Sequence, residues 1–82
     1  MPALSDQQKF KAARAILGWT QKDLATRAEI GQNTVVAFEL GTRAMMSKNK
    51  QACWEIFHNA GILFTDWTVG FIPTPKENTT HD

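Results

Sequence analysis

The stretch that decides the fold runs from Trp19 to Arg43 and reads "WTQKDLATRAEIGQNTVVAFELGTR". Two short helical patterns, over residues 21–28 and 32–40, are separated by residues 29–31 alone. Thr20 is a good N-cap for the first, and the second lies between Gly31 and Gly41. Helices this short are marginal by themselves, so they must be held by packing. The sequence therefore predicts two short helices joined by a tight turn.

Longer helical patterns flank this pair. Ser5 and Gln8 have the spacing of a capping box, and Gly18 is placed to end a helix over residues 6–17. Ser47 is the predicted N-cap of a helix over residues 48–60, which Gly61 ends. Apolar residues recur at helical spacing in both patterns: Phe10, Ala13, Ile16 and Leu17 in the first, and Cys53, Ile56, Phe57 and Ala60 in the second.

The chain beyond residue 61 has a different character. Residues 62–73 are rich in β-forming residues and lack helical periodicity, and Pro73 and Pro75 stop the pattern. Residues 74–82 are polar, and we expect a disordered tail there. We therefore predict a mainly α fold, with a four-helix domain over residues 1–61 and a C-terminal β segment over residues 62–73.

The β segment leaves two arrangements open. It could form an internal hairpin on the helix over residues 48–60, although its turn near Asp66 lacks Asn-Gly or Asp-Gly, and a lone hairpin is marginal. It could instead pair with the same segment of a second chain in a two-fold dimer, which we favour. The expected dimer interface consists of Trp54, Phe64, Trp67, Val69 and Phe71. The alternative for the tryptophans is that they complete a small core.

Composition sets bounds on function. The chain has 82 residues, enough for one small domain, and a net charge of +1. The eight Lys/Arg and five acidic residues of 1–60 give that span an excess of +3, whereas residues 61–82 carry −2. No apolar run approaches the ~18 residues of a membrane span, and the start lacks a signal pattern, so we expect a cytoplasmic protein. Its single cysteine, Cys53, fits a reducing compartment.

Catalysis and cofactor binding are not expected. The two histidines, His58 and His81, lack ligand spacing with other donors, and no set of nucleophile and base converges. Cys53 lies on an apolar stripe, which is typical of a buried small residue. We therefore predict no enzyme activity, no metal, no cofactor and no small-molecule ligand.

The second helix of the central pair begins with side chains suited to reading base edges. Two short helices joined by about three residues are the layout of a helix-turn-helix, in which the second helix can enter the major groove of DNA. Gln32 and Asn33 suit the N6/N7 edge of adenine, and Thr34 can bond a base or contact a thymine methyl group. Ala37 is small enough to let the backbone approach the bases. We therefore predict base contacts from these four residues.

Residues around this helix are placed to hold the DNA backbone. The N–H groups at the start of the helix over residues 21–28, next to Thr20 and Gln21, form a natural phosphate seat. Gln21 could bond the phosphate and brace Gln32. Arg43 and Lys48 lie on the far side and could reach the next phosphates. The expected phosphate-contacting residues are therefore Thr20, Gln21, Arg43 and Lys48.

The run "RAILGWTQKDLATRAEIGQNTVVAFELGTR", Arg14 to Arg43, resembles the phage repressor and Cro-type helix-turn-helix family, also called lambda-repressor-like or XRE-type. The resemblance covers residues 6 to about 43. It implies a compact helical domain, commonly of five helices, that binds operator DNA as a dimer. It also implies a structural ion pair between Arg14 and Glu39. Residues at characteristic places are Gly18, Gln21, Leu24, Ala25, Ala28, Ile30, Thr34, Val35, Phe38, Glu39, Gly41 and Arg43.

The chain departs from the family pattern in its turn and in its reading helix. Gly31 stands where Ser or Thr commonly caps the second helix, so one cap or phosphate contact is missing. Glu29 stands where Gly is common, and it would strain a left-handed backbone by ~1 kcal/mol or more unless the turn differs. Ala37 replaces a longer polar residue. The C-terminal β segment replaces the usual tail, which bears on dimer geometry.

Two functions from different classes follow. The first is a sequence-specific transcriptional regulator of the repressor or autoregulator type, which binds double-stranded DNA as a homodimer at an inverted repeat. By resemblance, such short regulators suit phage, plasmid or mobile-element control. The alternative is a protein-binding module, such as an antitoxin-like partner, in which the β segment and acidic tail engage another protein and DNA binding is secondary. The low net charge and the missing cap favour the alternative.

Overall fold

Four helices and a two-stranded hairpin follow one another along residues 2–72, the part of the chain that the computed structural model describes. The predicted mainly helical fold with four helices and a β segment is confirmed, and these residues contain no fifth helix. The predicted disordered tail, residues 74–82, and Pro73 lie outside the described residues. The elements are α1 (Asp6–Leu17), α2 (Gln21–Ala28), α3 (Gln32–Leu40), α4 (Ser47–Asn59), β1 (Ile62–Phe64) and β2 (Val69–Phe71).

Local sequence signals fix the starts of α1 and α2. Ser5 Oγ accepts from the Gln8 N–H at 3.1 Å, while Gln8 Oε1 accepts from the Ser5 N–H at 2.8 Å. Thr20 and Asp23 repeat this reciprocal capping box at α2, with distances of 3.0 and 2.9 Å. The Thr20 backbone N–H, followed by its hydroxyl, lowers the pKa of the Asp23 carboxyl. Both helices therefore begin where their sequences predict.

The later helices start without such caps. Gly31 is the N-cap of α3, and it has no side chain that could accept a capping hydrogen bond. The N-cap of α4 is Met46, and Ser47 is already the first helical residue, so the prediction that Ser47 caps this helix is wrong. Ile16, expected on the buried stripe of α1, is 37% exposed. Packing, rather than capping, therefore holds α3 and α4 in place.

The core is built around the ring of Phe10. Its centroid lies 4.8 Å from that of Phe38 in α3, and 4.8 and 5.4 Å from those of Trp54 and Phe57 in α4. Tilted and edge-on ring pairs at these distances stabilise a core beyond the area they bury. The buried hydrophobic residues are Phe10, Ala13, Leu24, Ala25, Val35, Phe38, Met45, Cys53, Phe57 and Ile62.

The two strands pair with each other within one chain. They are antiparallel, with Ile62 opposite Phe71 and Phe64 opposite Val69. The turn between them is closed at Thr65, whose N–H donates to the Thr68 carbonyl at 2.9 Å and whose Oγ1 accepts from the Thr68 N–H. Hydroxyl-to-backbone bonds of this kind replace the Asn-Gly chemistry of shorter turns. The β segment therefore forms an internal hairpin, the arrangement that we did not favour.

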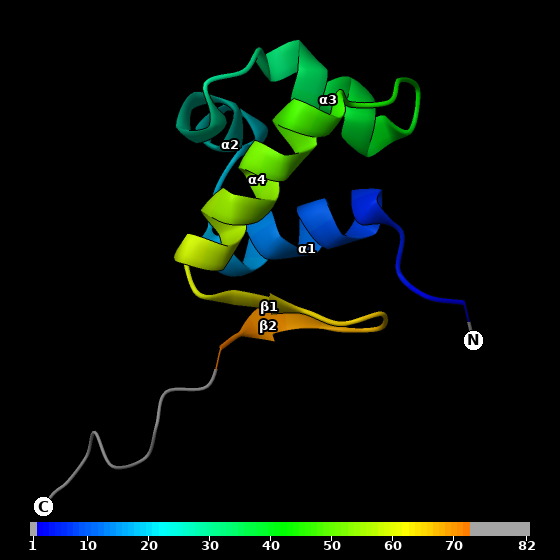
Figure 1. The fold of residues 1–82 in the computed structure, drawn as a ribbon, viewed down its shortest axis with the longest axis vertical. Helices are drawn as coiled ribbons and strands as arrows, with labels where there is room; N and C mark the ends of the chain where they lie inside the picture. The colour runs from blue at the N-terminus through cyan, green and yellow to red at the C-terminus, as the bar shows by residue number, and fades with distance from the viewer. Residues whose placement is uncertain (1, 73–82) are drawn as a thin grey trace, which may run out of the picture.

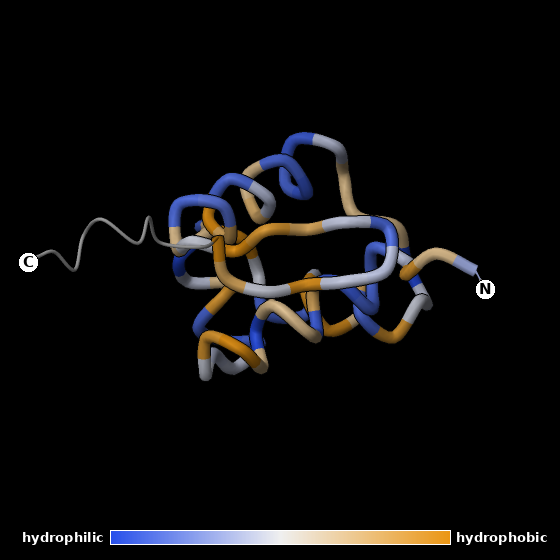
Figure 2. The backbone as a smooth tube through the Cα atoms, turned by 90° about the horizontal axis from the view of Figure 1, so that it is seen from below, coloured by the Kyte–Doolittle hydropathy of each residue, from blue (hydrophilic) through white to orange (hydrophobic). Residues whose placement is uncertain are grey.

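The hairpin and the central helix pair lie at opposite ends of the molecule. In Figure 1, α2 and α3 occupy one end, α1 and α4 cross the middle, and β1 and β2 lie below α1. Seen from below in Figure 2, the hairpin lies across the near side, with hydrophobic positions along both strands. The Leu4 N–H donates to the Asp66 carbonyl at 2.6 Å and joins the start of the chain to the hairpin turn.

Candidate nucleic-acid interface

The turn between α2 and α3 is tight because Glu29 adopts a left-handed conformation. Its φ of 58° and ψ of 45° place it in the region that favours glycine, and it is the one non-glycine residue of the described chain there. The Glu29 N–H donates to Thr26, and the Ile30 N–H donates to the Ala25 carbonyl at 3.0 Å. Three residues therefore suffice to redirect the chain, and Ile30 packs against the core between the helices.

The start of α3 presents its polar side chains to solvent. Gln32 and Asn33 are exposed, while Thr34 and Ala37 are half-buried. Asn33, Thr34 and Ala37 line one hollow of about 430 Å³ together with Thr42 and Arg43. The structure thus brings three of the four predicted base-contacting residues to the same hollow as one predicted phosphate contact.

Thr42 belongs to this hollow but was not among the predicted site residues. Its hydroxyl donates to the Ala37 carbonyl at 3.2 Å, and its N–H donates to the same oxygen at 3.0 Å. These bonds satisfy an orphan carbonyl at the end of α3, where Gly41 has a φ of 79°. The position directly after the glycine C-cap and before Arg43 was the available sequence signal.

The predicted phosphate-contacting residues flank α3 in sequence. Thr20, Arg43 and Lys48 are exposed, and Gln21 is half-buried as the first residue of α2. The Gln21 amide donates to Glu39 Oε1 at 3.3 Å, so it braces the end of α3 rather than Gln32. Gln21 was expected to support the start of α3, and it instead supports its end.

Arg14 and Glu39 form a bidentate ion pair between α1 and α3. Arg14 Nε donates to Glu39 Oε2 at 2.7 Å, and Nη2 donates to Oε1 at 2.6 Å. The Glu39 side chain is 1% exposed and that of Arg14 is 17% exposed. A carboxylate this deeply buried needs such a partner, because an unpaired buried charge is very costly. The pair therefore fixes α3 to the body of the domain.

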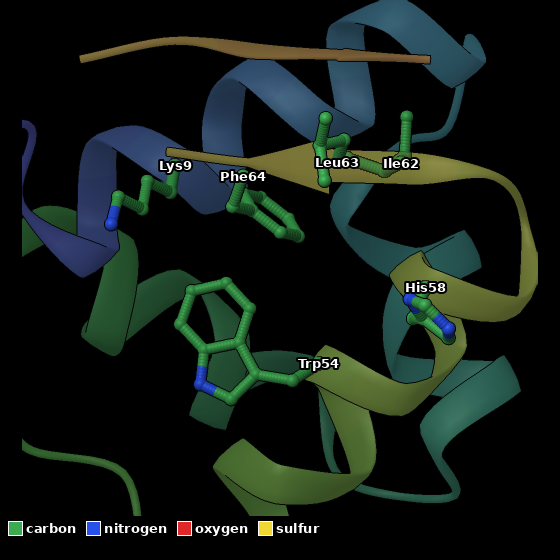
Figure 3. A pocket seen from close by; sticks show the side chains of 6 residues that line it. All are labelled: Lys9, Trp54, His58, Ile62, Leu63 and Phe64. Atoms are coloured by element: carbon green, nitrogen blue, oxygen red, sulfur yellow. The ribbon is translucent and has the colours of Figure 1, made fainter. Parts of the chain in front are cut away.

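The residues expected at a dimer interface divide into two groups. Trp54, Phe64 and Val69 are half-buried against the core, and the centroids of the Trp54 and Phe64 rings are 4.9 Å apart. Both rings line a pocket of about 400 Å³, together with side chains from α1, α4 and β1 (Figure 3). Trp67 and Phe71, in contrast, are 59% and 58% exposed. The exposed part of the hairpin also includes Leu63 and Ile72.

Two further properties of residues 2–72 bear on function. No three His, Cys, Asp or Glu side chains lie close enough together there to hold a metal ion. None of the four helices is both long and apolar enough to cross a membrane.

The comparison with known families agrees with this geometry. Residues 10–47 match the family model described as Helix-turn-helix, a segment that begins in α1 and ends at the first residue of α4. No curated protein matches the chain. The matched segment contains the left-handed turn, the exposed start of α3 and the Arg14–Glu39 pair. The match supports an XRE-type, lambda-repressor-like helix-turn-helix in this part of the chain and, with it, a DNA-binding transcriptional regulator.

Proposed function

We propose that the protein is a sequence-specific repressor or autoregulator that binds an inverted-repeat operator through α3. The observation that carries this proposal is the exposed start of α3, where Asn33, Thr34 and Ala37 share one hollow with Arg43. A helix that offers amides and a hydroxyl at its tip can donate to and accept from base edges in the major groove. Arg43 beside these side chains would hold a phosphate while they read the bases.

The phosphate contacts are assigned to the two sides of α3. Thr20 and Gln21 lie at the start of α2, where free N–H groups and the helix dipole favour an anion. Arg43 and Lys48 are exposed after α3 and would meet phosphates on its other side. Arg43 should therefore contribute equally to the affinity for every DNA sequence. Its removal should lower the magnitude of the slope of log K against log salt concentration by about one per protomer.

A homodimer suits this function because an inverted repeat requires two-fold symmetry. The Thr65 N–H donates to the Thr68 carbonyl, and the Ile72 N–H donates to the Gly61 carbonyl. Residues that bond across an antiparallel pair alternate with residues that do not, so the N–H and C=O groups of Ile62 and Phe64 point away from β2. Those of Val69 and Phe71 point away from β1 in the same way. Since the hairpin and α3 lie at opposite ends, stacking two hairpins face to face would aim the helices in opposite directions (Figure 1).

We therefore assign dimerisation to a hairpin edge rather than to its face. Two chains placed side by side, edge to edge, keep both copies of α3 on one side of the dimer. Such an arrangement allows the helices to enter successive major grooves about 34 Å apart. The exposed Phe71 and the half-buried Val69, both on β2, would lie at the contact.

The deciding experiment is selection of bound sequences from a random pool of duplex DNA. We expect an inverted repeat whose half-sites are about ten base pairs apart from centre to centre. Asn33→Ala and Gln32→Ala should each weaken binding to that site by about 1–3 kcal/mol and relax preference at one base pair of each half-site. Gln51→Ala, which removes an exposed amide from α4, is the matched control and should change neither quantity.

Recovery of no preferred sequence would refute the proposal. So would unchanged discrimination in both α3 variants, because base reading would then lie elsewhere.

The exposed apolar hairpin favours a second candidate, a protein-binding module of the antitoxin type. Leu63, Trp67, Phe71 and Ile72 are 41–59% exposed and lie far from α3. Light scattering and a salt titration on random duplex DNA separate the two functions. A monomer without DNA affinity at low salt would favour the protein-binding module.

A further inference from the structure

The carboxylate of Glu39 joins the end of α3 to the start of α2. Its Oε1 accepts from Gln21 Nε2 at 3.3 Å as well as from Arg14 Nη2 at 2.6 Å. Arg14 Nη1 donates in addition to the Trp19 carbonyl at 3.0 Å, one residue before the N-cap of α2. Polar contacts from one buried ion pair therefore reach the backbone just before α2 and the first side chain of α2.

This contact dictates the orientation of the Gln21 amide. A carboxylate can only accept hydrogen bonds, so the NH₂ group of Gln21 must face Glu39 and its carbonyl oxygen must point away. One N–H of that NH₂ group remains for another acceptor. A DNA phosphate also only accepts hydrogen bonds, so this remaining N–H is the group of the Gln21 side chain that can donate to it.

Arg14 removes the electrostatic cost of this arrangement. An unpaired Glu39 carboxylate close to a phosphate would repel it, and the repulsion would be strong where water is excluded. Arg14 forms two hydrogen bonds to the carboxylate and cancels its charge. The Arg14–Glu39 pair therefore adds no net negative charge to that of Asp23 at the start of α2, and it leaves the Gln21 amide in a fixed orientation.

We propose that Glu39 and Arg14 are positioning residues for DNA binding: they orient the Gln21 amide so that its second N–H donates to a DNA phosphate. The proposal rests on the proposed function, since it assigns the Arg14–Glu39 pair a role in binding in addition to its role in the fold. The pair acts through Gln21 and makes no DNA contact of its own.

A double-mutant cycle tests this coupling. The variant Arg14→Met/Glu39→Met removes both charges together, so the net charge is unchanged, and apolar replacement of a buried ion pair often preserves the fold. Its affinity for duplex DNA is measured with Gln21 present and in a Gln21→Ala background. Urea unfolding of all four proteins shows that each is folded.

We expect the paired substitution to weaken binding about fivefold more when Gln21 is present than when it is absent, as for groups in one hydrogen-bond network. Equal weakening in both backgrounds would overturn the proposal, because a purely structural role would affect both alike. If the Met pair does not fold, Arg14→Gln/Glu39→Gln takes its place, since it also keeps the net charge and an amide at position 39 can no longer dictate the Gln21 orientation.

Two controls separate this proposal from the proposed function. The same cycle with Asn33→Ala in place of Gln21→Ala should be additive, because Asn33 is exposed and has no hydrogen bond to Arg14, Gln21 or Glu39. DNA binding with additive effects throughout would refute the positioning role alone. Failure of the parent protein to bind duplex DNA at low salt would overturn both.

Discussion

At the scale of single residues, a buried thiol on α4 lies within electrostatic reach of the Glu39 carboxylate. Cys53 is fully buried on α4, and burial, with a smaller contribution from the nearby Glu39 charge, raises the pKa of its thiol from 9.0 to about 11. Since the thiolate is the reactive form, this environment suppresses reactivity twice, by excluding the reagent and by retaining the proton.

Cys53 should therefore resist alkylation in the folded protein. At pH 8 the raised pKa leaves about 100-fold less thiolate than in the unfolded chain, before the loss of access is counted. Iodoacetamide labelling followed by mass spectrometry should show slow modification in buffer and rapid modification in urea. Rapid labelling in buffer would contradict the buried position.

The raised pKa of Cys53 also makes the free energy of unfolding depend on pH in the alkaline range. The folded state retains the thiol proton to higher pH than the unfolded chain. The contribution of Cys53 to the free energy of unfolding is therefore fully present below about pH 9. It is lost as the pH rises towards 11, and urea unfolding across this range would measure the loss.

At the scale of elements, the turn between α2 and α3 stores strain. Glu29 holds a left-handed conformation that disfavours any residue with a Cβ atom, yet this conformation ends α2 and allows α3 to start three residues later. Its N–H still donates to the last carbonyls of α2. The geometry of the helix pair is therefore maintained against a local cost.

Glu29→Gly should relieve that cost. We expect the free energy of unfolding to rise by about 1 kcal/mol, because glycine adopts positive φ without steric conflict. Glu29→Ala is the matched control, since it removes the same charge but keeps the Cβ atom. Equal effects of the two variants on urea unfolding would show that charge, rather than backbone conformation, matters here.

At the scale of the whole molecule, the exposed apolar surface and the proposed DNA-binding surface are separated. Helix α3 lies at one end, and the exposed Leu63, Trp67 and Phe71 of the hairpin lie at the other (Figure 1). This separation allows one surface to contact DNA while another contacts a second chain.

If the protein dimerises through the hairpin edge as proposed, Phe71→Lys should separate it into folded monomers. Phe71 is 58% exposed, so the charge should disturb an interface more than the core, and binding to a full inverted repeat should weaken. Sedimentation equilibrium measures the assembly. Leu40→Lys, which places the same charge on a residue 68% exposed at the end of α3, should leave the assembly unchanged. A dimeric Phe71→Lys protein would exclude the hairpin edge as the interface.

The sequence by itself determined where α1, α2 and α3 begin and end. Their boundaries depend on signals within one turn of the chain, such as the capping boxes at Ser5 and Thr20 and the glycine at each end of α3. The amide side chains at the start of α3 follow directly from its first residues. Such features are local, so neighbouring residues suffice to specify them.

Only the tertiary structure decided which residues meet across the fold. The Gln21–Glu39 bond spans 18 residues, and the Arg14–Glu39 bonds span 25. Whether Trp54 lies in the core and whether β1 pairs within its own chain depended on how α4 packs on Phe10 and the hairpin. The physical reason is that local signals specify each helix, whereas burial and hydrogen bonding between distant segments depend on the packing of all of them at once.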